Sequence, residues 1–487
     1  MKIRYLLRGA AAALALEAGS TPTFAQDSAT QQLLQRLHEK GILTKEEFDQ
    51  IMAETRTRPD PAPAPAPAPA QAAAPAASPQ IAAQEEAAED LDSSRMVRMT
   101  QSGIGLEVGP ATIKFSGSIN AFYVNDNPDT PGPNTTVGGG IAAVGANSSN
   151  AVRNGLLPGY LLIDVTTEQA GLDIGAHFGM YPGINSAVWG PLGANSGGQP
   201  TALATAGIDF RQVYLTIGGE FGRIKMGRDI GLFSSEAILN DITLLAAGPP
   251  GGNVAPGNTT LGRIGSGYIY TDFQPQITYT SPTLGGFQAS VGVFQPLQSL
   301  TAPPQTNTAP GFQGKLTYDK AFGEIAMRLW ASGVTQRHET IGEGTGGLVS
   351  YTGRGLDLGG KFTVGPFSAV ANWYTAKGLG TTVLNLLDTD ALGNPRGSNG
   401  FYLQGLATFG KISLGASYGE STLDLTENEA APNNELVRTN SSYVGQLRYG
   451  LTDWVTLLAE YTRAMSEAHG GNEAQSDSIA AGAILFF

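Results

Sequence analysis

The sequence predicts an all-β fold, a transmembrane antiparallel β-barrel of about 16 strands with an even number of strands, as in bacterial barrels. Three observations predict it: long stretches alternate polar and apolar residues, glycine accounts for 65 of 487 residues, and only 15% of residues are charged. Soluble domains carry about 25% charged residues. After the first few dozen positions the chain has no apolar run of about 18 residues, so spanning helices are excluded and a closed barrel remains.

The composition also limits the chemistry. The chain has no cysteine and a formal net charge of −13. Disulfides and thiolate metal sites are therefore excluded, and a nucleic-acid partner is not expected because phosphate binding needs a basic surface. Neither a phosphate loop nor a nucleophile elbow is present in its required context. The four histidines fit no metal-ligand spacing: His38, His177, His338 and His469. We expect no enzyme activity, metal or cofactor.

The N-terminal region has three parts before the barrel. Residues 1–26 have a basic start, the apolar run 9–16 and a small-x-small site at 23–25, which is typical of a secretory signal peptide. Residues 27–58 show the three- and four-residue apolar spacing of helices. Residues 59–95 alternate proline and alanine and then become acidic, which predicts a semi-rigid linker. The barrel would occupy 96–487.

The helical segment 27–58 has two interpretations. Thr44 and Glu47 form a capping box that restarts a helix after Gly41. The apolar stripe is too short to be buried alone, so packing against copies of itself as a coiled-coil oligomerisation arm is one interpretation. A solvated spacer or an element that contacts the cell wall is the other. In both cases this arm would lie in the periplasm.

Alternation of period two identifies the strands. Around 112–123, 356–363 and 443–449, apolar residues occupy one face and polar residues the other. A strand with one lipid-facing and one water-facing side has this pattern. A soluble sandwich would alternate as well, but the chain ends in an amphipathic segment closed by Phe487, which is typical of outer-membrane barrels.

The connections give the strand count. Seven short turns are expected near 169–171, 218–222, 281–285, 320–323, 365–366, 409–411 and 450–453. Eight longer loops are expected near 125–157, 182–206, 228–262, 297–310, 337–350, 379–398, 423–436 and 466–476. Together they connect about 16 strands, with turns on one rim and loops on the other. We interpret 264–280 as one long strand with a bulge at Pro275.

The loop 227–262 is the candidate constriction. Its segment Ser234–Leu245 carries more large apolar residues than an extracellular loop would keep in water. Folding inward against the barrel wall, as a short helix, accounts for them. Glu236 and Asp241 would then be acidic groups at the narrowing. The alternative is a surface loop that covers a subunit interface.

Basic residues are the candidates for charge selectivity, because a channel selects ions by the sign of its lining charges. Those that strand parity points inward are Lys114, Lys315, Arg328, Lys361 and Arg448. Arg211, Lys225, Arg228 and Arg263 bracket the constriction loop. Arg211 lies on the same side of its predicted strand as Val213, so this side could instead contact a neighbouring subunit. All of these residues could instead be ordinary wall charges paired with acidic neighbours such as Asp357.

Three runs of sequence resemble the DcaP-like outer-membrane porins: 221–233, 237–244 and 262–268. The resemblance is strongest over 208–296. It implies a trimer of 16-stranded barrels, an N-terminal extension prone to coiled-coil assembly, and uptake of small anionic compounds such as dicarboxylates. It places Arg228 and Asp229 at the start of the constriction loop and Arg263 at its end.

These observations lead to one functional expectation and two alternatives. We expect a homotrimeric porin in the bacterial outer membrane, in contact with its lipid, that passes small hydrophilic solutes by diffusion and favours small anions. A general or cation-tolerant porin is the first alternative. A structural protein that tethers the membrane to the cell wall through residues 27–58, with little conduction, is the second.

The basic residues give a first prediction. Arg448→Ala and Arg263→Ala should each lower anion preference, because each removes a lumen charge that attracts anions. Reversal potentials in planar bilayers under a salt gradient measure this preference. Reversal potentials equal to the wild-type value would contradict both assignments, and absence of conductance would favour the tether.

Overall fold

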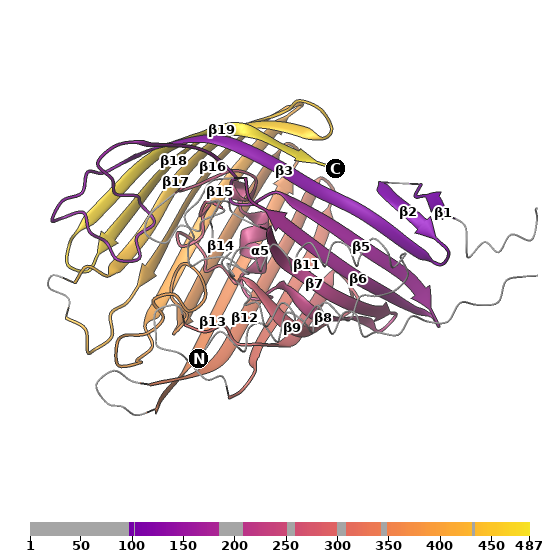
Figure 1. The fold of residues 1–487 in the computed structure, drawn as a ribbon, viewed down its shortest axis with the longest axis horizontal. Helices are drawn as coiled ribbons and strands as arrows, with labels where there is room; N and C mark the ends of the chain where they lie inside the picture. Colours follow the sequence, from indigo (N-terminus) through magenta and orange to yellow (C-terminus); the bar gives the residue numbers. More distant parts are fainter. Residues whose placement is uncertain are drawn as a thin grey trace, which may run out of the picture. The chain divides into compact units, whose positions relative to one another are not determined.

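The structure is a computed structural model, and Figure 1 shows its fold. The chain divides into a unit at 1–83 and a unit at 84–487. The described residues all belong to the second unit: 97–101, 103–184, 208–250, 259–299, 308–341, 348–430 and 434–487. The expected signal peptide 1–26, helical arm 27–58 and linker 59–95 lie outside them.

The second unit is a closed antiparallel barrel of 16 strands, which confirms the predicted fold class. The ring closes because β19 pairs with β3 and because β9 pairs with both β8 and β10. Its strands are β3 (Ala111–Pro128), β5 (Tyr160–Gln169), β6 (Leu172–Pro182), β7 (Ile208–Gly219), β8 (Gly222–Ile230), β9 (Phe273–Thr280), β10 (Phe287–Phe294), β11 (Gly311–Phe322), β12 (Ile325–Ile341), β13 (Leu348–Val364), β14 (Phe367–Lys377), β15 (Gly397–Phe409), β16 (Ile412–Leu423), β17 (Val437–Gly450), β18 (Val455–Ala468) and β19 (Glu473–Phe486).

Five smaller elements complete the described part. The hairpin of β1 (Val97–Met99) and β2 (Ile104–Val108) pairs with the start of β3, and β4 (Ser149–Arg153) pairs with the end of β3. Helix α5 (Ser235–Asn240) and the 3-10 helix η2 (Ile242–Leu245) follow β8. No helix among the described residues is long and apolar enough to cross a membrane.

The predicted turns and loops alternate around the barrel. All seven short turns connect strands where expected, and glycines in the left-handed region, such as Gly323 (φ 61°) and Gly410 (φ 59°), allow the chain to reverse there. The eight longer connections join strand ends at the other rim. Two are shorter than expected: β18 and β19 leave only 469–472 in place of 466–476, and β12 and β13 leave only 342–347 in place of 337–350.

The interpretation of 264–280 as one long strand is wrong. Strand β9 begins at Phe273, and 264–272 belong to the preceding loop. The register with β8 continues through Pro275 without a shift, so no bulge is needed. In this register Pro275 pairs with Arg228 of β8. The strand count is unaffected.

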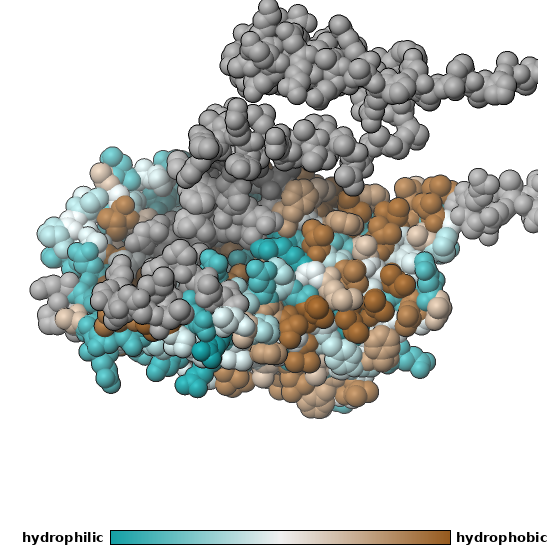
Figure 2. All heavy atoms as spheres, turned by 60° about the horizontal axis from the view of Figure 1, so that its bottom comes forward, coloured by the Kyte–Doolittle hydropathy of each residue, from teal (hydrophilic) through white to brown (hydrophobic). Residues whose placement is uncertain are grey.

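The outer wall is apolar, as the alternation predicts. On β13, Leu356, Leu358 and Phe362 are 42–45% exposed, whereas Asp357 between them is fully buried on the inner side. Figure 2 shows apolar residues gathered on part of the barrel surface, with hydrophilic residues dominating towards one end. A lipid-facing belt flanked by polar rims has this distribution.

A β-bulge corrects the face expected for Arg211. Gly179 of β6 pairs with Gln212 of β7, but the next pair is Tyr181 with Asp209. Two residues of β7, Phe210 and Arg211, therefore lie opposite one residue of β6. The extra residue reverses the alternation. Arg211 is only 8% exposed, and its guanidinium lies over the ring of Tyr181 inside the barrel, so it does not share the outer face of Val213.

The main core lies inside the barrel rather than between two layers. Its buried residues come from the loop after β8, from the loop after β3, and from the inner faces of several strands: Val137, Ile141, Leu156, Ala237, Ile238, Leu261, Ile264, Tyr268, Trp330, Val370, Tyr402, Leu423 and Val437. The loop after β8 supplies its centre. This apolar packing fills part of the lumen and leaves the passage to the remaining inner surface.

Closure between β19 and β3 gives the second prediction. A Cβ at Gly482 would lie 2.0 Å from the carbonyl oxygen of Ala121, so Gly482→Ala forces the two strands apart. Overpacking of this kind costs about 1–3 kcal/mol. We expect the folded barrel band on unheated gels to convert to the unfolded band at a lower temperature.

Gly445→Ala is the matched control, because a Cβ at Gly445 has no heavy atom within 4 Å. It should leave the conversion temperature unchanged. Equal conversion temperatures for wild type and Gly482→Ala would contradict the close approach of β19 to β3.

Candidate functional site: the pore constriction

The long loop between β8 and β9 is described at 231–250 and 259–272, and these residues are called the inner loop below. It turns at Ser234, a non-glycine residue in the left-handed region (φ 58°). The backbone N–H of Ser234 donates to the hydroxyl of Ser332 on β12 (2.9 Å) and to the carboxylate of Asp357 on β13 (3.2 Å). Gln313 of β11 accepts from the two preceding N–H groups at 2.7 and 2.9 Å. These bonds hold the start of α5 against the inner wall.

The next part of the loop, residues 240–248, is attached to the opposite strands of the sheet. The side chain of Gln404 on β15 donates to the carbonyl of Asn240 (2.6 Å) and accepts from the N–H of Ile242 (3.0 Å). Arg448 on β17 donates through Nη2 to the carbonyl of Ile242 (2.7 Å). Glu460 on β18 accepts from two later backbone N–H groups at 3.1 and 2.6 Å. The inner loop therefore crosses the lumen from β11 to β18, as predicted from its apolar residues.

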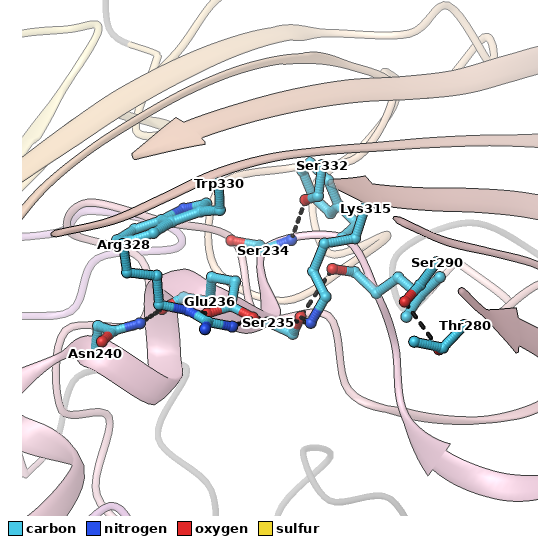
Figure 3. A network of polar contacts seen from close by, with 12 residues as sticks. Ser234, Ser235, Glu236, Asn240, Thr280, Ser290, Lys315, Arg328, Trp330 and Ser332 are labelled. Atoms are coloured by element: carbon cyan, nitrogen blue, oxygen red, sulfur yellow. Dashed lines mark hydrogen bonds and ion pairs between the residues drawn. The ribbon is translucent and has the colours of Figure 1, made fainter. Parts of the chain in front are cut away.

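Glu236 of α5 is the centre of an ion-pair cluster (Figure 3). Its carboxylate accepts from Lys315 Nζ of β11 (2.9 Å) and from Nε and Nη2 of Arg328 on β12 (2.9 and 3.0 Å). Arg328 also contacts Asp319 through Nη1 (2.8 Å). Burial alone would raise the pKa of Glu236, but the hydrogen bonds and charges of Arg328 and Lys315 outweigh it and hold the pKa below its ordinary value.

A further cation lies beside this cluster. Lys361 of β13 lies directly opposite Arg328 in the register and therefore points to the same inner side. Within the described part of the chain, Lys361 has no ion-pair or hydrogen-bond partner. Three cations, Lys315, Arg328 and Lys361, thus share the inner wall at β11–β13 with three carboxylates, Glu236, Asp319 and Asp357. Glu236 and Asp319 pair with Lys315 and Arg328, and Asp357 is completely buried and accepts from Ser234 and Ser332. Lys361 is therefore left without a partner carboxylate among the described residues.

A second polar cluster lines the wall formed by β6–β8. Lys225 and Asp229 form an ion pair, and Gln212 donates to the same carboxylate (2.8 Å). Tyr181 donates to Gln212 (2.5 Å), and the guanidinium of Arg211 lies 5.1 Å from the centre of the Tyr181 ring. The sequence-predicted residues Arg211, Lys225 and Asp229 are therefore brought together on the inner side.

Arg228 and Arg263 occupy other positions. The register pairs Arg228 with Val213, which is 42% exposed on the outer wall, so Arg228 falls on the outward face of β8. Arg263 is completely buried within the inner loop and donates to the carbonyl and hydroxyl of Ser442 on β17 (3.3 and 3.1 Å). Burial lowers the pKa of Arg263. It acts as an anchor of the loop rather than as a water-facing charge, so the expectation that Arg263→Ala lowers anion preference by removing a lumen charge is wrong in its premise.

Asp241 is also an anchor. Its carboxylate accepts from the N–H of Thr243 (2.9 Å) and from the hydroxyl of Tyr268 (3.1 Å), and it caps the start of η2. It is 4% exposed. Of the two acidic groups expected at the narrowing, Glu236 lies beside the cationic wall and Asp241 lies inside the loop.

Hollows open on both sides of the inner loop. One of about 450 Å³ is lined on the long-loop side by Asp126, Arg153 and Pro250. Another of about 370 Å³, on the short-turn side, is lined by Lys411 and Arg448. The inner loop therefore separates two vestibules, as a constriction does.

Sequence reasoning missed several lumen charges. Asp319, Lys411 and Glu460 lie on the inner side, and Asp164 of β5 contacts His177 of β6. Strand parity could have identified Glu460, because Ala459 and Tyr461 flank it with outward-facing side chains. No pattern in the sequence indicated the two partners of Glu236, since Lys315 and Arg328 are far from it along the chain.

Comparison with known proteins agrees with this geometry. The barrel with an inward loop defines a bacterial outer-membrane diffusion channel. The sequence profile of the family described as Gram-negative porin matches residues 70–469, and the chain belongs to this family. No curated protein matches the chain by sequence.

Two solved structures share the fold. The outer membrane channel DcaP of Acinetobacter baumannii is 14% identical, with a TM-score of 0.57, over 80% of this chain and 99% of that chain. The anion-selective porin from Comamonas acidovorans is 14% identical, with a TM-score of 0.52, over 77% of this chain and 100% of that chain. The expected likeness to the DcaP-like channels is confirmed, and the protein is a porin of the outer membrane.

The Glu236 cluster gives the third prediction. Glu236→Gln leaves Lys315 and Arg328 without their shared carboxylate, and removing one partner of a buried ion pair costs about 3–5 kcal/mol. The inner loop should detach intermittently, so single-channel records should show frequent closures or steps that wild type lacks at neutral pH.

The attachment of the inner loop through Glu236 should weaken as the pH falls. The pKa of Glu236 is lowered from 4.5, so the stabilisation it provides is complete above that value and is lost as the pH falls through the lowered pKa. Wild type should become unsteady only in that acidic range, whereas Glu236→Gln should be unsteady throughout. Glu339→Gln, which removes a carboxylate from the exposed pair with Arg337, is the control. A quiet Glu236→Gln channel at neutral pH would contradict the anchor.

Proposed function

We propose that this porin favours small anions, in particular small carboxylates such as dicarboxylates. The observation that carries the proposal is Lys361, a cation beside Arg328 on the inner wall that has no ion-pair partner among the described residues. The nearby carboxylate of Asp357 is completely buried and turned to Ser234 and Ser332. A positive lining raises the local concentration of anions and lowers that of cations.

Arg448 supports the proposal from the other side of the constriction. Its Nε and Nη2 donate to Gln446, and Nη2 also holds the inner loop. The guanidinium lines the short-turn vestibule together with Lys411. Because two of its nitrogens fix its orientation, it presents a preorganised cation to a passing solute. A solute with two carboxylates would meet one positive centre at β13 and a second at β17.

The likeness to the anion-selective porin of Comamonas acidovorans agrees with this preference. The net charge of the whole chain, −13, does not oppose it, since that sum includes loops and the N-terminal region outside the lumen.

We also propose a homotrimer whose residues 27–58 form a helical arm in the periplasm. The resemblance to DcaP-like porins supports the trimer. Contact of the arm with the cell wall remains the alternative role.

The fourth prediction tests the anion preference. Lys361→Gln removes the unpaired lumen cation. A unit charge about 8 Å from a permeating ion in water contributes about 0.5 kcal/mol, with opposite signs for chloride and potassium, so the ratio of chloride to potassium permeability should fall roughly fivefold. Reversal potentials in a potassium chloride gradient provide the ratio, and the same gradient with succinate measures the carboxylate.

Lys320→Gln is the matched control, because Lys320 lies on the outward face of β11 near Phe322. It should leave the reversal potential unchanged. Cation selectivity of the wild-type channel would contradict the proposal and favour the cation-tolerant porin. Equal effects of Lys361→Gln and Lys320→Gln on the reversal potential would contradict the proposal that Lys361 contributes to anion preference.

A further inference from the structure

Two exposed cations lie side by side on the outer wall of the barrel. Arg354 of β13 and Lys377 of β14 are direct partners in the register. Both side chains are exposed, as are Leu356, two residues after Arg354, and Trp373, four residues before Lys377, on the same outward face. The pair therefore points away from the lumen and cannot act on solutes in the pore.

The height of this pair places it at the edge of the lipid belt. Arg354 is ten residues from Val364, where β13 ends at the short-turn rim. A strand that rises about 3.3 Å per residue at a tilt of about 40° climbs about 25 Å over that distance, which equals the height of the apolar belt of such barrels. Arg354 and Lys377 thus lie where the hydrocarbon ends and lipid headgroups begin, on the long-loop side.

The charges of this pair are not compensated within the described part of the chain. Like charges directly opposite each other in a sheet destabilise it. The other outward arginine of this region, Arg337, contacts Glu339 at 3.4 Å. Neither Arg354 nor Lys377 has an ion-pair or hydrogen-bond partner among the described residues. An anion from outside the chain would offset the repulsion.

We propose that Arg354 and Lys377 bind the anionic phosphate headgroup of a lipid in the outer leaflet. Arginine donates two parallel hydrogen bonds to phosphate oxygens, and lysine adds a point charge. The acyl chains of the lipid lie on the apolar surface below, along Leu356, Leu358 and Trp373, which is the partner of Leu358 in the register. This site is separate from the proposed anion preference of the pore.

The fifth prediction uses the full chain in detergent, titrated with lipid A that carries two phosphates and analysed by native mass spectrometry. Arg354→Gln together with Lys377→Gln should weaken binding about thirtyfold, and each single substitution about fivefold, because each basic residue near a phosphate contributes similarly. Lys320→Gln, an outward cation at the opposite rim, should leave binding unchanged. Bilayer conductance of the double variant should match wild type, which verifies its fold independently of lipid binding.

Two further arms identify the source of the phosphate. Dephosphorylated lipid A should bind wild type as weakly as the double variant binds the phosphorylated form. Inorganic phosphate at equal concentration should not displace the lipid, since it lacks acyl chains. Displacement by inorganic phosphate would overturn the lipid as ligand. Equal binding of phosphorylated lipid A to wild type and to the single and double variants would overturn the site.

Discussion

The constraint on which this structure depends is that every backbone hydrogen-bonding group in a bilayer must be paired within the protein. A sheet satisfies this requirement only when it has no free edge, so β19 must meet β3. The terminal residue takes part, because Phe487 and Gly117 exchange two backbone hydrogen bonds of 3.1 Å. Closure fixes the register of each strand, and the register decides which side chains point to lipid and which to the lumen.

The closed wall creates a second problem, which the inner loop solves. A barrel of this size has a lumen wider than one layer of side chains can fill. The inner loop occupies much of it, with Ala237 and Ile238 packed in an apolar core and backbone groups satisfied by Gln313, Gln404 and Glu460. Because these anchors come from strands spread over β11–β18, the loop is held across the lumen rather than hinged at its ends.

Charge is used differently on the three surfaces of the wall. Buried charges such as Arg263 and Asp241 are bound by neighbouring polar groups and hold the loop. Lumen charges such as Lys361 remain open to solute. Outward charges such as Arg354 and Lys377 lie at the edge of the apolar belt. The contribution of a charged residue to transport therefore depends more on whether it is buried, faces the lumen or faces outward than on the sign of its charge.

The sequence by itself determined the local features: period-two alternation, glycine and proline at the turns, and the apolar segment of the long loop. These depend on neighbours along the chain, so strand number, the turns and the inward loop, with its short helix at Ser235–Asn240, could be predicted. Tertiary structure decided what depends on pairing across strands. The extra residue in β7 turns Arg211 inward, and the path of the inner loop buries Arg263. Glu236, which follows β8 in the chain, contacts Lys315 of β11 and Arg328 of β12. A side chain's partner on another strand follows from the register of the closed ring, and one strand's sequence does not contain that register.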